Sequence, residues 1–175
     1  MDQQVWKRDQ LTLFEKENLY EFELSQMDPN ISSQDPSHNP PLHSRVLVAD
    51  DFEQVFDCLQ GFEKDVGVSS STRERALYVF NNTVTVGTFW GNELVSTARM
   101  NSTSDTHTTI GFVYTKPDKR RRGLGKMTFQ FLFDECKRRQ LTHVVLFTSL
   151  SSTANNFYTN LGFKHVGNIG LFEHA

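Results

Sequence analysis

The sequence has few cysteines and no long hydrophobic run. Its 175 residues include only two cysteines, Cys58 and Cys136, which excludes a disulfide framework. Both fall on apolar faces of expected helices, so we expect buried, reduced thiols. No run of about 18 apolar residues occurs, which excludes a hydrophobic membrane-spanning helix. The first residues lack the apolar segment of a secretory signal, so we expect a cytoplasmic protein, with a nuclear location left open.

Neither sign of charge is in large excess, because 18 basic residues stand against 21 acidic ones. The net charge is −3 at pH 7, which disfavours bulk nucleic-acid binding. His38 and His43 lie in a segment rich in proline, serine and asparagine and have no partners at ligand spacing. The sequence therefore predicts no metal site, and its length predicts one domain with a buried core.

The most informative segment is residues 120–125, which read Arg-Arg-Arg-Gly-Leu-Gly. An apolar, strand-like run at 110–114 and a proline turn precede it, and an amphipathic helical pattern follows. The first N–H groups of a helix lack intrahelical partners and carry partial positive charge, and glycines let an anion approach the backbone. The segment indicates either a diphosphate site or a solvated basic turn that caps a helix.

The glycine spacing excludes two common nucleotide-binding motifs. Position 128 is threonine, so the G-x-G-x-x-G pattern of dinucleotide-binding folds is absent. The G-x-x-x-x-G-K-[ST] loop of ATPases is absent as well. The pattern that remains is R-x-x-G-x-G.

A second segment, residues 151–163, reads as a short helix that ends in Leu-Gly-Phe, with Gly162 suited to a left-handed helix end. Together the two segments resemble the GNAT N-acetyltransferase superfamily. Its pyrophosphate loop, [RQ]-x-x-G-x-[GA], is matched by Arg120, Gly123 and Gly125. Its closing motif, A-x-x-x-Y-x-x-x-G-F, is matched by Ala154, Tyr158, Gly162 and Phe163. The resemblance covers about residues 45–175.

The remaining patterns agree with the element order of that family. They predict a strand at 45–48, a helix opened by Asp50 and Asp51 with Glu53 able to complete a capping box, a hairpin around Gly91-Asn92, a helix, and a strand at 144–147. The resemblance implies an α/β GNAT fold, with a mixed central sheet flanked by helices on both faces. We expect residues 45–175 to form the acetyltransferase domain and 1–44 an N-terminal extension and linker.

The secondary structure of the N-terminal extension is harder to predict from the sequence. Within residues 9–27 the apolar side chains of Tyr20, Phe22 and Leu24 alternate like a strand, but the composition favours a helix. Three alternative roles stay open for the segment: packing on the domain, forming part of the acceptor site, or serving as the arm of a homodimer.

The resemblance implies an acetyl-CoA-dependent N-acetyltransferase, with acetyl-CoA as co-substrate and no metal. It would transfer the acetyl group to a primary amine, of a small molecule or of a peptide or protein, by direct attack in a ternary complex. One alternative is a catalytically silent CoA-binding or regulatory module. Another is a nucleic-acid binder that uses the basic run at 119–122.

The resemblance also implies roles for particular residues. Tyr158 would be the general acid for the departing thiolate, the alternative being a ring that packs on the sheet. The backbone of the loop would meet the diphosphate, and the strand before it the pantetheine arm. The cofactor-binding residues would be Val113, Thr115, Arg120, Arg121, Arg122, Gly123, Leu124, Gly125, Lys126 and Ser151.

Two positions depart from the family pattern. Ser151 stands where many relatives have a cofactor-contacting asparagine, and Thr109 where some have a glutamate base. A base would then come from another residue, act through water, or be unnecessary for an amine of low pKa. The candidates are His107, Glu93, Asp57 and Glu63.

Overall fold

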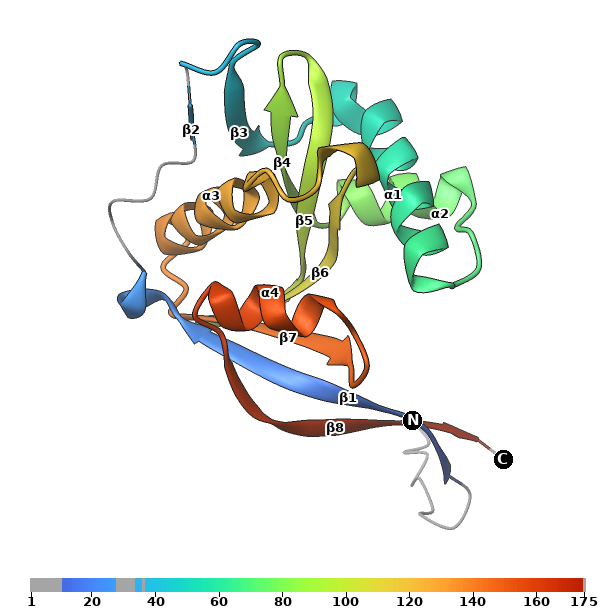
Figure 1. Ribbon diagram of the computed structural model, residues 1–175. Helices are drawn as coiled ribbons and strands as arrows, with labels where there is room; N and C mark the ends of the chain where they lie inside the picture. Colours follow the sequence, from blue (N-terminus) through green and yellow to red (C-terminus); the bar gives the residue numbers. More distant parts are fainter. Residues whose placement is uncertain (1–10, 28–33, 36, 175) are drawn as a thin grey trace. The chain divides into compact units, whose positions relative to one another are not determined.

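The computed structural model describes residues 11–27, 34–35 and 37–174 (Figure 1). The described chain forms two compact units. The larger unit comprises Glu23–Val145, and the smaller one combines Met1–Phe22 with Leu146–Ala175.

The larger unit is built on strands that pair in chain order, each antiparallel to the next. They are β2 (Gln34–Asp35), β3 (Leu42–Val46), β4 (Val84–Trp90), β5 (Glu93–Thr103) and β6 (His107–Thr115). The expected hairpin is confirmed, because Trp90 at the end of β4 pairs with Glu93 at the start of β5. The first expected strand is present as β3, which begins three residues earlier than the sequence pattern indicated.

Helices cover both faces of this sheet. The helices α1 (Phe52–Val66) and α2 (Arg73–Asn81) lie on one face, and α3 (Leu124–Arg138) lies on the other (Figure 1). β5 contributes side chains to both faces, because consecutive residues of a strand point in opposite directions. Leu94 packs in the cluster formed with α1 and α2, whereas Val95 packs against Leu124 of α3. The expected layering of helices on both faces is therefore confirmed within this unit.

The start of α1 differs from the expected capping box. A 3-10 turn at Ala49–Asp51 precedes the helix and moves its start beyond Asp50. Asp51 takes the cap position, and its carboxylate accepts a hydrogen bond from the Val48 N–H at 2.8 Å. It also pairs with Arg45, with N–O distances of 2.6 and 2.7 Å. Asp51 thereby fastens the beginning of α1 to β3.

The smaller unit is organised around the pairing of two long strands. β1 (Leu11–Glu23) runs antiparallel to β8 (Lys164–His174), with β7 (His143–Ser149) on the other side of β1. The unit boundary falls within β7, and α4 (Ala154–Asn160) follows that strand. The helical interpretation of residues 9–27 is wrong for the described part, because the ladder with β8 supplies hydrogen bonds that composition does not encode.

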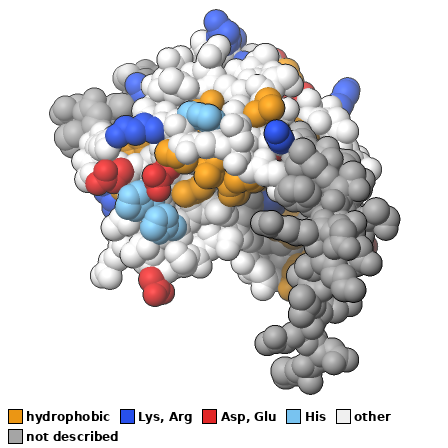
Figure 2. Space-filling model, turned by 90° about the horizontal axis from the view of Figure 1, so that it is seen from below, with side chains coloured by type: hydrophobic (Ala, Val, Ile, Leu, Met, Phe, Trp, Pro, Cys, Tyr) orange, Lys and Arg blue, Asp and Glu red, His pale blue; other side chains and the backbone are white. Residues whose placement is uncertain are grey.

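Four large apolar side chains of the smaller unit are exposed: Phe147, Leu150, Val166 and Leu171. Figure 2 shows one face of the molecule, with apolar side chains in orange. None of the described helices is long and apolar enough to cross a membrane. Both cysteines are free and buried, as expected, and burial raises the pKa of Cys58 to about 11 and that of Cys136 to about 12. Both thiols therefore stay protonated at neutral pH.

Candidate functional site

The basic turn of the larger unit has the local structure that its sequence predicts. A 3-10 turn at Pro117–Lys119 follows β6, and α3 begins at Leu124. Gly123 caps the helix with a φ of +79°, a conformation that glycine adopts without strain. A Cβ built at Gly123 would meet no atom within 4 Å. The N-terminus of α3 therefore opens onto space in which an anion could approach the backbone.

The charges around the turn are divided into two groups. Arg120 is held by the protein, because it pairs with Asp65 of α1 and its Nε donates to the Thr115 carbonyl at 2.8 Å. Lys119 is held by Glu93 at 3.5 Å. Across the described ranges, three exposed cations of the loop make no ion pair: Arg121, Arg122 and Lys126. These three side chains are the ones available to an anionic ligand.

The strand that leads into the turn contains a strained bulge. Thr97 pairs with Tyr114 and Arg99 pairs with Gly111, so two residues of β6, Phe112 and Val113, lie opposite one residue of β5. Phe112 has a φ of +48°, which is an outlier for a bulky residue. Such strain costs about 1–3 kcal/mol, persists only where the surroundings enforce it, and is common at functional sites.

Packing on α1 enforces the bulge. The Phe112 side chain is 3% exposed and lies edge-to-face against Phe62, with ring centroids 5.6 Å apart. The bulge was not predicted from the sequence, although Gly111, directly before Phe112, is an isolated strand glycine of the kind that often marks a bulge. The bulge lies at Val113, to which the family resemblance gives contact with the pantetheine arm. It is two residues from Thr115, whose hydroxyl is hydrogen-bonded to that of Ser96 at 2.9 Å.

The candidate bases of the larger unit differ in how they are engaged. Glu93 accepts a hydrogen bond from Lys116 at 2.8 Å, which lowers its pKa and makes it a weaker base. Glu63 is buried and accepts from the Ser71 N–H at 3.0 Å, so it holds the loop after α1. Asp57 is exposed on α1. Glu93 is exposed as well but is paired with two lysines, whereas Asp57 forms no ion pair with any described residue.

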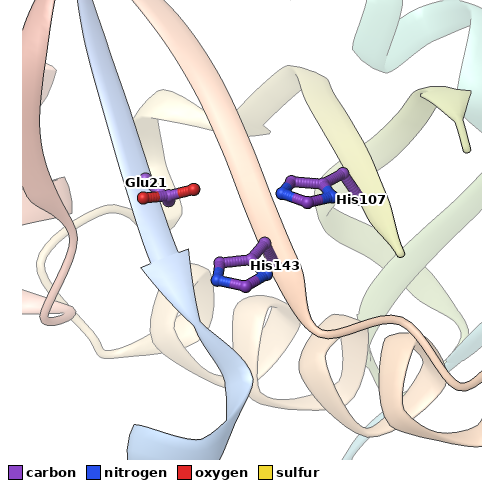
Figure 3. Close-up of side chains that lie close together, drawn as sticks. All are labelled: Glu21, His107 and His143. Carbon is purple, nitrogen blue, oxygen red and sulfur yellow. The ribbon is translucent and has the colours of Figure 1, made fainter.

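His107 forms a stacked pair with His143 (Figure 3). The ring centroids are 4.6 Å apart and the rings are inclined by 9°. The Thr142 hydroxyl donates to the Thr106 carbonyl at 3.1 Å, so it accepts from the His143 Nδ1–H at 2.8 Å. Glu21, also labelled in Figure 3, is part of the smaller unit.

Tyr158 and Ser151 are part of the smaller unit, whereas the other predicted site residues belong to the larger one. Tyr158 lies in α4 and is 6% exposed, with its ring centroid 6.3 Å from that of Tyr20 and 5.9 Å from that of Phe163. Burial raises the pKa of Tyr158 above its ordinary value, so the phenol is protonated at neutral pH. That is the form which a general acid needs.

The turn before α4 is held by a residue that sequence reasoning missed. Asn155 donates from Nδ2 to the carbonyls of Ser149 and Leu150 at 3.3 and 3.2 Å, and the Thr148 hydroxyl bonds to its Oδ1. Ser151 is exposed in this turn, with its Oγ 3.4 Å from that of Ser149. Gly162 closes the helix with a φ of +96°, as the sequence predicts.

Known proteins match both the sequence and the fold. Residues 50–163 match a family model described as Acetyltransferase (GNAT) family. No curated protein matches the chain. The fold is similar to a GCN5-related N-acetyltransferase from Sphaerobacter thermophilus, with a TM-score of 0.69 and 18% identity over 94% of this chain and 53% of that one. A GCN5-related N-acetyltransferase from Kribbella flavida gives 0.64 and 17%, over 94% and 60%.

A smaller solved structure is also similar. It is a predicted acetyltransferase with acetyl-CoA from Clostridium acetobutylicum, with a TM-score of 0.60 and 19% identity over 71% of this chain and 91% of that one. The chain spans little more than half the length of the two larger relatives. At these identities the likeness establishes the fold, and it confirms the α/β class with a mixed sheet.

Proposed function

Because the chain belongs to the acetyltransferase (GNAT) family, we propose that it is an acetyl-CoA-dependent N-acetyltransferase that acts on a primary amine of a small molecule or a peptide. The observation that carries the proposal is the open glycine turn at the start of α3, directly after the bulged strand β6. A diphosphate fits this place, because backbone N–H groups and exposed cations meet there.

The donor would be held mainly by backbone groups of the larger unit. In our proposal the N–H groups at the start of α3, from Leu124 to Lys126, bind the diphosphate, while Arg121 and Arg122 add charge. The pantetheine arm lies along Val113 and Thr115. A bulge leaves backbone groups of its extra residue outside the ladder, so one N–H there can polarise the thioester carbonyl.

The chemistry would be a direct transfer. The neutral amine attacks the thioester carbon, the C–N bond forms, and the C–S bond breaks. Tyr158 gives its phenolic proton to the departing thiolate. The amine's proton passes to water or to a carboxylate. Among the carboxylates, we propose Asp57 as the acceptor of this proton, because it is exposed on α1.

Thermal unfolding tests donor binding. Acetyl-CoA at about 100 times its dissociation constant should stabilise the fold by about 2.7 kcal/mol, and adenosine should stabilise it much less. Gly123→Asp should abolish the effect, because it puts a carboxylate beside the proposed diphosphate position. Gly67→Asp is the matched control, since Gly67 ends α1 with a φ of +73° and has similar open space. If acetyl-CoA stabilises Gly123→Asp and Gly67→Asp to the same extent, the diphosphate is not bound at Gly123.

Release of free thiol from acetyl-CoA, followed with a panel of amines, tests the transfer itself. Thiol release that requires an amine supports the acetyltransferase. The second candidate function is a catalytically silent CoA-binding module. It is favoured by Thr109, which stands where some relatives have a glutamate base. Acetyl-CoA binding without thiol release for any amine would favour that second function.

A further inference from the structure

Arg99 lies beside the strained bulge of the larger unit. It is on β5 and pairs with Gly111, the residue that directly precedes Phe112. Its guanidinium carbon is 5.5 Å from the centre of the Phe112 ring, so the cation lies against the residue with positive φ. Arg99 is therefore on the α1 side of the sheet, next to the strand proposed to hold the thioester.

A neighbouring amide fixes the orientation of Arg99. Its Nε donates to Oδ1 of Asn101 at 2.7 Å. A side chain at position 111 would collide with the Asn101 amide, so Gly111 makes room for this contact. The hydrogen bond uses one of the five N–H groups of the guanidinium, and the Nη1 and Nη2 groups form a planar pair suited to a carboxylate.

The charge of Arg99 is not balanced within the described chain. Arg45 and Arg99 are the two arginines with intermediate burial in the described ranges, and the others there are exposed. Arg45 has a carboxylate partner in Asp51, whereas Arg99 forms no ion pair with any described residue. Burial lowers the pKa of Arg99, in keeping with a guanidinium that lacks a counter-charge. A partly desolvated cation without a counter-charge lowers the stability of the fold.

We propose that Arg99 binds a carboxylate of the acceptor, so that the substrates are amines which also carry a carboxylate, such as amino acids. The inference rests on the proposed function and names its substrate class. One guanidinium flanked by an amide and an aromatic ring matches a planar group with a single negative charge. The position beside Phe112 places this anchor next to the bulge where the amine would meet the thioester.

Matched pairs of acceptors test the proposal. Each amino acid is compared with the amine that lacks its carboxylate: lysine with cadaverine, tyrosine with tyramine, and histidine with histamine. We expect kcat/KM to favour the amino acid by about tenfold or more, because a charge-assisted pair would be lost in the amine. Arg99→Gln should remove this preference through KM and leave acetyl-CoA affinity unchanged. Arg45→Gln is the control and should keep the preference.

A binding measurement makes the test independent of turnover. N-acetyltyrosine and its methyl ester are titrated into the full chain with CoA present, by calorimetry. Tighter binding of the acid than of the ester, lost in Arg99→Gln, supports the anchor even if no amine of the panel is acetylated, an outcome that would count against the proposed function alone. Equal binding of acid and ester, or a preference that Arg99→Gln retains, overturns the inference.

Discussion

Tyr158 combines burial with an aromatic surrounding, and this combination determines how its substitution should act. Tyr158→Phe keeps the ring that packs near Tyr20 and Phe163, so folding should hardly change. Turnover should fall by about 100-fold, near the lower end for a general acid, with little change in acetyl-CoA affinity. Pre-steady-state kinetics and a cofactor titration measure the two effects.

The control for this variant is Tyr20→Phe, which removes a neighbouring hydroxyl of the same unit. It should leave turnover within a few-fold of wild type. Because burial raises the pKa of Tyr158, activity should also not decline through loss of its proton near its ordinary pKa of 10.0. Unchanged turnover in Tyr158→Phe, with chemistry limiting the rate, would remove the hydroxyl from the mechanism.

Single residues were predictable from the sequence where a local motif fixes their conformation. Gly162 has the positive φ angle that its motif position indicates. Partners far apart in the chain were not predictable. The ion pair of Arg120 joins it to Asp65, 55 residues away. The isolation of Arg99 likewise depends on which side chains the folded sheet brings near it, and no local pattern contains that information.

The start of α1 gives a prediction at the scale of one element. Asp51 is 5% exposed, and its hydrogen bond and ion pair with Arg45 lower its pKa below the ordinary value of 3.8. A carboxyl group with a lowered folded-state pKa adds stability that is present above the ordinary value. That stability is lost as the pH falls through the folded-state pKa.

Asp51→Asn should therefore lower the free energy of unfolding at pH 7 by about 1–2 kcal/mol, a figure reduced for the partial exposure of Arg45. The difference from wild type should shrink as the pH falls below 3.8. Urea denaturation at several pH values measures it. Asp50→Asn makes the same charge change at an exposed neighbour and should have little effect. A difference that is constant down to strongly acidic pH would disagree with the ion-pair explanation.

Elements with strong periodicity were predicted better than elements held by distant partners. The pattern of apolar residues in α3 and the turn between β4 and β5 led to correct assignments. β1 was not resolved from the sequence alone, because its hydrogen bonds come from β8, more than a hundred residues later in the chain. The α1 cap was displaced by a 3-10 turn, which the sequence pattern does not distinguish from a first helical turn.

At the scale of the whole molecule, the proposed roles are divided between the two units. The donor loop and Arg99 belong to the larger unit, and Tyr158 belongs to the smaller one. The family pattern pointed to the donor loop and to Tyr158, because the two motifs are local, whereas it did not point to Arg99. The division follows from long-range pairing, in which β1 joins the C-terminal strands instead of the part of the chain that follows it.

This division predicts that a core substitution in one unit should act mainly on that unit. Phe22 is 4% exposed in the smaller unit, with its ring centroid 5.3 Å from that of Phe163. Phe22→Ala should cost about 3–5 kcal/mol of local stability, because it leaves a cavity. Hydrogen exchange should accelerate in β8, whereas β4 and β5 should keep their protection. Turnover should then fall more than acetyl-CoA affinity, because Tyr158 belongs to the weakened unit.

The matched control is Leu94→Ala, which removes a fully buried side chain from the larger unit. It should cost about 2–5 kcal/mol and accelerate exchange in β4 and β5 before β8. Acetyl-CoA affinity should weaken more than turnover, since α1, β5 and β6 support the donor loop. If both variants instead accelerate exchange equally in β4, β5 and β8, the two units unfold as one cooperative body. Local stability would then give no basis for separating donor binding from proton donation.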